Sequence, residues 1–355
     1  MPSPAPQTFR ASPEQVNATI GAALRTWLPG KSWSDVKKML KSRLVTVSGN
    51  LCLDEGRRLK LDEVVKLLPF PAPAPPREDD VRIRFIDAHL VIVEKPAGMT
   101  TLRHPEERNW PKRRKQLQPT LDEMLPKIIA KREEGKQRGV AVRMTRGRKP
   151  VRAAPRTKGV TRRLRAVHRI DRETSGLMVF ARTVDAERVL GLQFRDHSLH
   201  RVYLAVALGH VREQTIESHL VPDRADGRRG STTNAKLGKR AVTHVKPIEY
   251  LPGYTVVECQ LETGRTHQIR IHLSELGHPL CGDKVYRGPF PGPPIPDQSG
   301  APRVALHAAE LGFEHPITGE SLRFAMPLPA DLATLIARLR SRQGGGGRKP
   351  RSPVE

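Results

Sequence analysis

Residues 167–179 read Val-His-Arg-Ile-Asp-Arg-Glu-Thr-Ser-Gly-Leu-Met-Val, and this stretch is the most informative part of the chain. It places Asp171 in a loop of basic and hydroxyl side chains that runs directly into an apolar strand. A carboxylate between His168, Arg169 and Arg172 should stay ionised, because adjacent cations favour the charged form. Such a carboxylate suits a nucleophile better than a general acid. A structural aspartate that caps a turn is the alternative.

Segments with the pattern of β-strands follow this loop, with few helices between them. A pair of strands around a turn at Asp87 also precedes it. The strands are expected over 82–86, 90–94, 177–181, 202–208, 215–220, 242–250 and 254–261. The helices are expected over 120–125, 185–194 and 266–276, and short elements around 304–306 and 322–324. Strands that mostly follow one another predict an α+β fold with a largely antiparallel mixed sheet and flanking helices.

A second informative segment is Arg201-Val202-Tyr203-Leu204-Ala205-Val206-Ala207. Its alternation places Tyr203 on the same face of a strand as Arg201 and Ala205. An aromatic ring in this position can stack on a nucleic-acid base. A core tyrosine with its hydroxyl bound to the backbone fits the alternation equally well.

The third segment, residues 261–273, reads Leu-Glu-Thr-Gly-Arg-Thr-His-Gln-Ile-Arg-Ile-His-Leu. We expect Gly264 to permit a strand-to-helix reversal and Thr266 to cap the helix that follows. His267 and His272 are five positions apart and no glutamate follows the first, which excludes a zinc-hydrolase helix. Both histidines are expected to be structural or hydrogen-bonding residues.

These three segments together resemble the RluA-type family of RNA pseudouridine synthases. Residues 168–176 match His-Arg-(Leu/Ile)-Asp-x-x-Thr-Ser-Gly, and residues 201–209 match (Lys/Arg)-x-Tyr-x-Ala-x-(Val/Ala)-x-Gly. Residues 261–272 match Leu-x-Thr-Gly-Arg-(Thr/Ser)-His-Gln-(Ile/Leu)-Arg-x-His throughout. The resemblance spans roughly residues 82–330 apart from a basic insertion, and it implies the pseudouridine synthase fold over 81–335.

The resemblance also implies the chemistry, which is the isomerisation of uridine to pseudouridine within an RNA chain. Asp171 corresponds to the catalytic aspartate, Tyr203 to the tyrosine that packs against the base and is proposed as a general base, and Arg270 to the arginine that pairs with the aspartate. The cations of these loops are the expected RNA contacts in this domain: His168, Arg169, Arg172 and Arg265. No metal and no nucleotide or redox cofactor is implied.

Residues 13–69 form a separate pattern of two helices and a small hairpin. The helices are expected over 16–24 and 34–40, the second capped by Ser34, and the hairpin turns at 48–50. Four cations lie near that turn: Lys37, Lys38, Lys41 and Arg43. The segment resembles the αL RNA-binding module of the ribosomal "S-four" type, and a helical pair whose lysines only face solvent is the alternative. Residues 1–12 are expected to be disordered, and the Pro-rich residues 70–80 to form a stiff linker.

Charge points to a polyanionic partner. The chain has 62 Lys and Arg against 37 acids, a formal charge of +25. Residues 131–165 alone carry 14 cations and two acids, which predicts an arm that neutralises RNA phosphates, or else a merely solvated loop. A flexible basic tail is expected over 341–355.

The remaining expectations concern partner and compartment. Ribosomal RNA is the expected substrate, with transfer RNA, or a noncatalytic RNA-binding ribosome-assembly factor, as alternatives. The three scattered cysteines form neither a zinc pattern nor a disulfide framework, and no apolar run is long enough to span a bilayer. The N-terminus lacks a secretory pattern, and a cytoplasmic location is expected. The protein is also expected to be monomeric.

Overall fold

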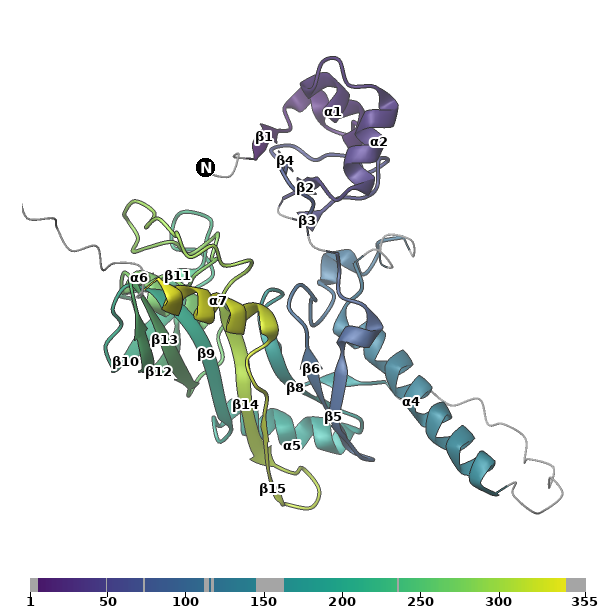
Figure 1. The fold of residues 1–355 in the computed structure, drawn as a ribbon, viewed down its shortest axis with the longest axis vertical. Coiled ribbons are helices and arrows are strands. Elements are labelled where there is room, and N and C mark those ends of the chain that lie inside the picture. Colours follow the sequence, from purple (N-terminus) through teal and green to yellow (C-terminus); the bar gives the residue numbers. More distant parts are fainter. Residues whose placement is uncertain are drawn as a thin grey trace, which may run out of the picture. The chain divides into compact units, whose positions relative to one another are not determined.

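The computed structural model describes residues 6–48, 50–72, 74–111, 115, 118–144, 163–234 and 236–342. The chain divides into two compact units (Figure 1). Unit 1 comprises Met1–Pro75 and Pro105–Pro119, and unit 2 comprises Pro76–His104 and Thr120–Glu355. The boundary at Pro75 falls within the linker predicted over 70–80. The sequence did not indicate that residues 105–119 belong with the N-terminal unit.

Unit 1 packs two helices on a small antiparallel sheet whose strand order is β1-β4-β2-β3. Its elements are β1 (Gln7–Arg10), α1 (Ile20–Trp27), α2 (Trp33–Lys41), β2 (Val45–Val47), β3 (Asn50–Leu51) and β4 (Val64–Leu67). Buried side chains from both helices and from β2 and β4 form one core. The helix pair and the hairpin therefore lie in the predicted order.

Three local predictions for unit 1 were wrong. Residues 7–10 are not disordered, because β1 pairs with β4 and Phe9 stacks on Trp27 with ring centroids 5.1 Å apart. The first helix begins at Ile20 rather than at residue 16, since Asn17 has a left-handed φ of 66°, which a helix cannot contain. The second helix is capped by Ser32 and not by Ser34.

Unit 2 is built on one mixed sheet, as predicted. Its described strands have the order β11-β10-β12-β13-β9-β14-β8-β6-β5, with β15 beside β14 and β7 beside β8. Every pair is antiparallel except β8 with β14. The strands are β5 (Arg82–Ile86), β6 (Leu90–Lys95), β7 (Arg165–Ala166), β8 (Ser175–Ala181), β9 (His200–Leu208), β10 (Gln214–Val221), β11 (Gly230–Thr232), β12 (Lys239–Leu251), β13 (Tyr254–Leu261), β14 (Leu306–Glu314) and β15 (Ser321–Ala325).

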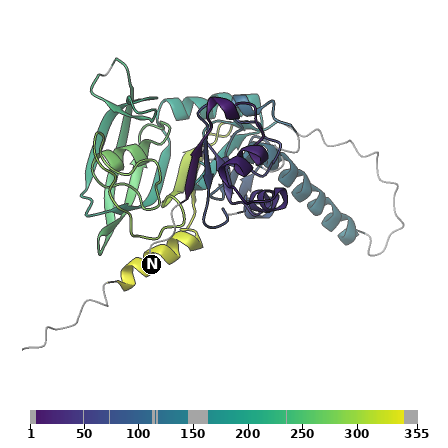
Figure 2. The same cartoon turned by 90° about the horizontal axis from the view of Figure 1, so that it is seen from above.

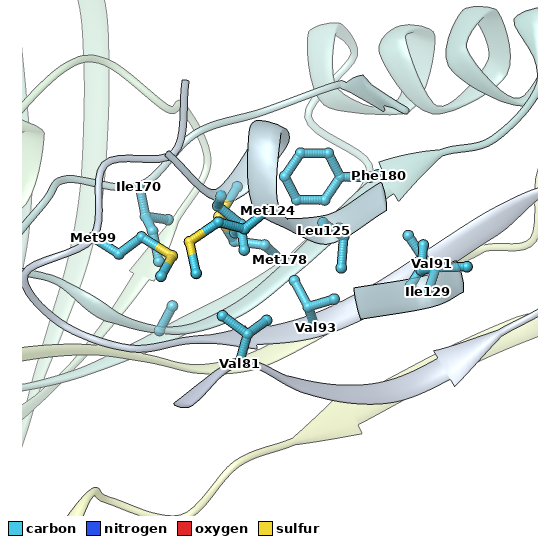
Figure 3. Close-up of a cluster of buried hydrophobic side chains, with 12 residues drawn as sticks. Val81, Val91, Val93, Met99, Met124, Leu125, Ile129, Ile170, Met178 and Phe180 are labelled. Atoms are coloured by element: carbon cyan, nitrogen blue, oxygen red, sulfur yellow. The ribbon is translucent and has the colours of Figure 1, made fainter. Parts of the chain in front are cut away.

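Helices cover both faces of this sheet because the strands are apolar on both sides. In β6, Val91 and Val93 pack against α4 (Leu121–Met144), as Figure 3 shows for Val93 beside Leu125. The alternate residues of β6 pack against α5 (Val184–Arg195). Successive side chains of a strand point to opposite faces, so a continuous apolar run predicts this double cover.

The other half of the sheet is covered in the same way. On one face, β9, β12 and β13 pack against α6 (Gln268–Glu275), and on the other face β9 and β13 pack against α7 (Ala330–Ser341). The sequence analysis did not predict α7. Its buried Leu332, Leu335, Ile336 and Leu339 belong to the core of unit 2.

The helix expected near residues 120–125 is much longer than predicted. α4 continues to Met144, so the first part of the basic insertion is helical. In Figures 1 and 2 this part of α4 extends beyond the sheet of unit 2. Residues 145–162 of the insertion and residues 343–355 of the predicted tail lie outside the described residues.

Candidate active site

The three segments singled out by sequence meet at one cavity of unit 2, of about 320 Å³. Asp171 comes from the loop between β7 and β8, Tyr203 from β9 and Arg270 from α6, and all three line the cavity. The sheet explains this convergence, because β14 lies between β8 and β9 and so brings the Asp171 loop close to Tyr203.

Asp171 lies between two basic side chains of the third segment. Its Oδ2 accepts a hydrogen bond from Arg270 Nη1 at 3.3 Å, and its Oδ1 lies 3.8 Å from His267 Nε2. The carboxylate remains partly exposed to the cavity. Burial lowers the pKa of His267, which favours its neutral form. Arg270 is therefore the cation that compensates the charge of Asp171.

Arg270 is itself held by a second acid, Asp283. Nε and Nη2 of Arg270 donate to the two carboxylate oxygens of Asp283 at 2.7 and 3.0 Å. Asp283 is fixed by the backbone N–H groups of Val285 and Tyr286, and the Tyr286 ring lies 5.0 Å below the guanidinium. The sequence analysis gave Asp283 no role. This fork-to-fork pair leaves Nη1 of Arg270 to face Asp171.

The N-cap of helix α6 lies one residue later than expected. Its N-cap is His267, which has a left-handed φ of 62°, and not Thr266. The Nδ1 atom of His267 lies 2.8 Å from the Tyr286 hydroxyl. This unusual backbone geometry directs the His267 ring toward Asp171, so the histidine is more closely tied to the site than its sequence pattern indicated.

Tyr203 has the features of a stacking residue. It packs against the cores on both sides of the site, and its hydroxyl has no hydrogen-bond partner among the residues that the structure describes. The alternative of a hydroxyl bound to the backbone is therefore wrong. Burial raises the pKa of Tyr203. The phenol is therefore protonated at neutral pH, as an unperturbed tyrosine also is.

His168 is not the cation that the sequence suggested. Burial, together with the charge of Arg201, lowers its pKa to about 3. Its Nε2 accepts a hydrogen bond from the backbone N–H of Val179, and its ring stacks on Phe194 with centroids 4.5 Å apart. His168 therefore fixes the loop to β8 as a neutral residue, and it neither stabilises the charge of Asp171 nor supplies a positive charge to RNA.

The other predicted cations divide into those that face the cavity and those that do not. Arg169 and Arg265 line it, and Arg169 is exposed. Arg172 does not line it, since its Nε donates to the carbonyl of Gly98. Only part of the predicted set is thus placed at the candidate site.

The four cations of unit 1 also differ from one another. Lys38 and Lys41 are exposed, and Lys37 forms an exposed ion pair with Glu55 at 3.3 Å. The guanidinium of Arg43 is used within the unit, where its Nε donates to the carbonyl of Ala72 at 2.8 Å. The lysines are therefore better placed than Arg43 to bind a polyanion.

The buried Lys95 supports the loop of Asp171 through hydrogen bonds to backbone carbonyls. Lys95 is fully buried, and its Nζ donates to the carbonyls of Pro96, Met99 and Arg172. Burial lowers its pKa to about 7. The backbone N–H of Gly98 donates to the same carbonyl of Arg172. The turn that follows β6 thus supports the loop of Asp171.

Arg303 supports the loop from the other side. Its Nη1 donates to the carbonyl of Glu173, its Nη2 donates to Ser175 Oγ, and the guanidinium pairs with Asp331 at the start of α7. A carboxylate and a set of carbonyls thus surround the charge. No signal in the sequence analysis pointed to Arg303.

Gly176 is required by packing rather than by a ligand. Its φ is 132°, and a Cβ atom there would lie 2.2 Å from the carbonyl oxygen of Ala308 in β14. Gly176 permits the parallel pairing of β8 with β14, which sets the position of the loop.

Two further observations limit the site. Within the described ranges, no group of three or more His, Cys, Asp or Glu side chains is placed to hold a metal ion. None of the described helices is both long and apolar enough to cross a membrane.

Comparison with known proteins gives one consistent result. Residues 89–275 match the family model described as RNA pseudouridylate synthase. The chain is 34% identical over 332 residues to "Ribosomal large subunit pseudouridine synthase D" of Zymomonas mobilis, covering 92% of this chain and 95% of that protein. It is 32% identical to the protein of the same name from Xanthomonas campestris, covering 90% and 88%. The fold is similar to that of the solved structure "Human RNA Pseudouridylate Synthase Domain Containing 4", with a TM-score of 0.50 and 22% identity over 73% of this chain and 92% of that one.

Proposed function

This chain belongs to the RNA pseudouridylate synthase family, and we propose that it isomerises specific uridines of ribosomal RNA with Asp171 as its nucleophile. The family assignment makes the chain an enzyme acting on RNA. The choice of ribosomal RNA rests on the names of its relatives, which cover most of the chain at 32–34% identity. Transfer RNA is the alternative substrate.

The observation that carries the catalytic assignment is the position of Asp171. It is a partly exposed carboxylate in a cavity, held by Arg270, which is itself fixed by Asp283. A nucleophile must be oriented and accessible, and both conditions are met here. The cavity volume of about 320 Å³ is within the range that holds a small ligand such as a base with its ribose.

The reaction proceeds on a uridine that has left the RNA stack. Flipping costs a few kcal/mol, and least at unpaired sites. The ring of Tyr203 stacks on the base, and Asp171 attacks either the anomeric carbon of the ribose or the uracil ring. The N-glycosidic bond breaks, the base turns, a carbon–carbon bond forms, and a nearby base removes the ring proton. The product is an isomer of the substrate, so atoms and electrons balance without a co-reactant.

Binding of the RNA is proposed to extend beyond the cavity. We take unit 1 to be an S-four-type RNA-binding module, a proposal supported by its helix pair and hairpin and by the exposed Lys38 and Lys41. In unit 2, the basic insertion over 131–165 is the second proposed source of phosphate contacts, and its cations lie mainly after residue 134. Such contacts supply affinity that falls steeply with salt but do not read the sequence.

The test is a map of pseudouridine across ribosomal and transfer RNA. Cells that lack the protein are compared with cells rescued by the wild type or by Asp171→Asn. Ribosomal sites that vanish with the deletion and return only with the wild type are the expected result. Sites confined to transfer RNA would replace the proposed substrate. If the protein binds RNA but no pseudouridine site depends on its presence, the noncatalytic ribosome-assembly factor would be supported instead.

A further inference from the structure

The cavity has a second region, which the proposed chemistry does not use. Its wall is formed by the end of α5 and the turn after it, by the start of β9 and by the turn between β13 and α6. The residues there are Phe194, Arg195, His197, Arg201 and Gly264. We propose that this region binds a phosphate group of the RNA strand beside the target uridine, with Arg201 as its principal ligand. The inference rests on the proposed function, because it assumes that the occupant of the cavity is RNA.

Arg201 is a buried cation with no carboxylate partner among the described residues. It is 6% exposed, and its Nη2 donates only to the carbonyls of Leu261 and Glu262. The Glu262 carboxylate is turned away and binds His244 at 2.8 Å. Nε of Arg201 is buried without a hydrogen-bond partner. An unpaired buried charge is costly, and an anionic ligand would offset that cost.

His197 adds a second unsatisfied group to the same region. Its Nδ1 is buried without a partner. Burial and the charges of Arg201 and Arg265 lower the pKa of His197. The contribution of the two arginines reflects the positive potential at this wall of the cavity. Arg195 and Arg265 also line the cavity. The region therefore has several cations and unused hydrogen-bonding atoms, and this combination suits a phosphate better than an uncharged base.

Gly264 leaves Arg201 open to a ligand. A Cβ atom at this position would lie 2.8 Å from Nη1 of Arg201, closer than real Cβ contacts come. Because Nη2 is tied to two carbonyls, the guanidinium cannot retreat freely from such a group. Because Gly264 has no side chain, a ligand can reach Nη1 of Arg201, the terminal nitrogen for which no hydrogen bond within the described residues is found.

The placement also fits the chain of an RNA substrate. Arg201 and Tyr203 lie two residues apart on β9 and both line the cavity. A base stacked on Tyr203 would bring its own backbone, or that of the next nucleotide, toward Arg201. A bound phosphate would hold the nucleotide in the flipped position, where Asp171 reaches it.

The test measures RNA binding by four proteins: the wild type, Arg201→Gln, Gly264→Ala and the control Gly191→Ala. Gly191 is a suitable control because a Cβ there meets nothing within 4 Å. The probe is a short fluorescent oligouridylate, titrated over a range of salt concentrations, with thermal unfolding of each protein measured in parallel. Loss of one phosphate contact should reduce the slope of log K against log salt by about 0.7.

Arg201→Gln and Gly264→Ala should both show the smaller slope and bind roughly ten- to a hundredfold more weakly, the range expected for a charge-assisted hydrogen bond. Gly191→Ala should match the wild type. An unchanged slope in both site variants would overturn the subsite. If Arg201→Gln fails to fold, Gly264→Ala decides the question, since it retains the arginine.

A second measurement separates this inference from the proposed function. A stem-loop RNA carrying a uridine found by the pseudouridine map is prepared with single neutral methylphosphonate linkages next to that uridine. One such linkage should slow the wild type and have no further effect on Arg201→Gln. Equal losses in both proteins would overturn the subsite while leaving the synthase activity established. A wild type that binds the oligouridylate with the expected slopes but modifies no RNA would overturn only the proposed function.

Discussion

Replacement of Asp283 by asparagine tests whether Asp283 must fix the position of Arg270 beside Asp171. The amide keeps the shape of the side chain but removes its charge and one of its acceptor oxygens, so one of the two bonds of 2.7 and 3.0 Å from Arg270 is lost and the other has a neutral acceptor. The loss should amount to about 2 kcal/mol in total. Arg270 is then drawn toward Asp171, which is already 3.3 Å from its Nη1.

The expected result is a kcat lower by roughly 30-fold, which corresponds to about 2 kcal/mol, with little change in KM. Pseudouridine formation is followed against RNA concentration, and thermal unfolding is measured for each protein. Glu249→Gln is the matched control, because Glu249 pairs with Arg340 through two bonds of 2.6 Å and neither residue lines the cavity. A lower Tm with an unchanged kcat would refute the reasoning, since Asp283 would then serve stability alone.

Three other outcomes are expected. Asp171→Asn should retain RNA affinity in a binding titration but form no pseudouridine in a product assay, because the amide cannot act as the nucleophile. The pKa of Lys95 is about 7 in the folded protein against 10.5 ordinarily, so the unfolded chain binds more protons between these values and stability should rise with pH across that window, by up to a few kcal/mol. Lys95→Met should flatten this rise in denaturant titrations at several pH values. Gly176→Ala should destabilise the protein by roughly 3 kcal/mol or more in thermal unfolding, because the Cβ would meet Ala308 at a positive φ, whereas Gly191→Ala should be close to neutral.

The sequence predicted the sheet well because its signal is local. Alternating or continuous apolar runs located most strands of unit 2, and the expected strand over 254–261 agrees with β13. The central strand β14 was missed, since it overlaps the short element expected around 304–306 at one residue only, and β7 and β11 were not predicted. The helix that was missed, α7, lies near the predicted basic tail. Its stability comes from packing Leu332 and Leu335 against strands far away in the chain, which no local pattern reveals.

Burial decided which site predictions failed. His168, Arg169 and Arg172 are similar candidates in the sequence, yet their environments differ. His168 is a half-buried neutral ring that binds the backbone of β8, Arg169 is exposed at the cavity, and Arg172 binds a backbone carbonyl. The geometry of Asp171, Tyr203 and Arg270 was indicated only through the family resemblance, because their separation along the chain is large. The roles of Asp283 and Arg303 depend on tertiary contacts and were not predicted.

The support that Arg303 gives to the loop of Asp171 has a consequence for the order in which the protein folds during synthesis. Arg303 lies 130 residues beyond Glu173, and its partner Asp331 begins α7, the last described helix. A nascent chain therefore contains Asp171, the proposed nucleophile, long before it contains the residues that fix the loop. Domains tend to fold from the N-terminus during translation. Unit 1 can complete most of its fold early, whereas a competent catalytic loop has to wait until α7 has left the ribosome.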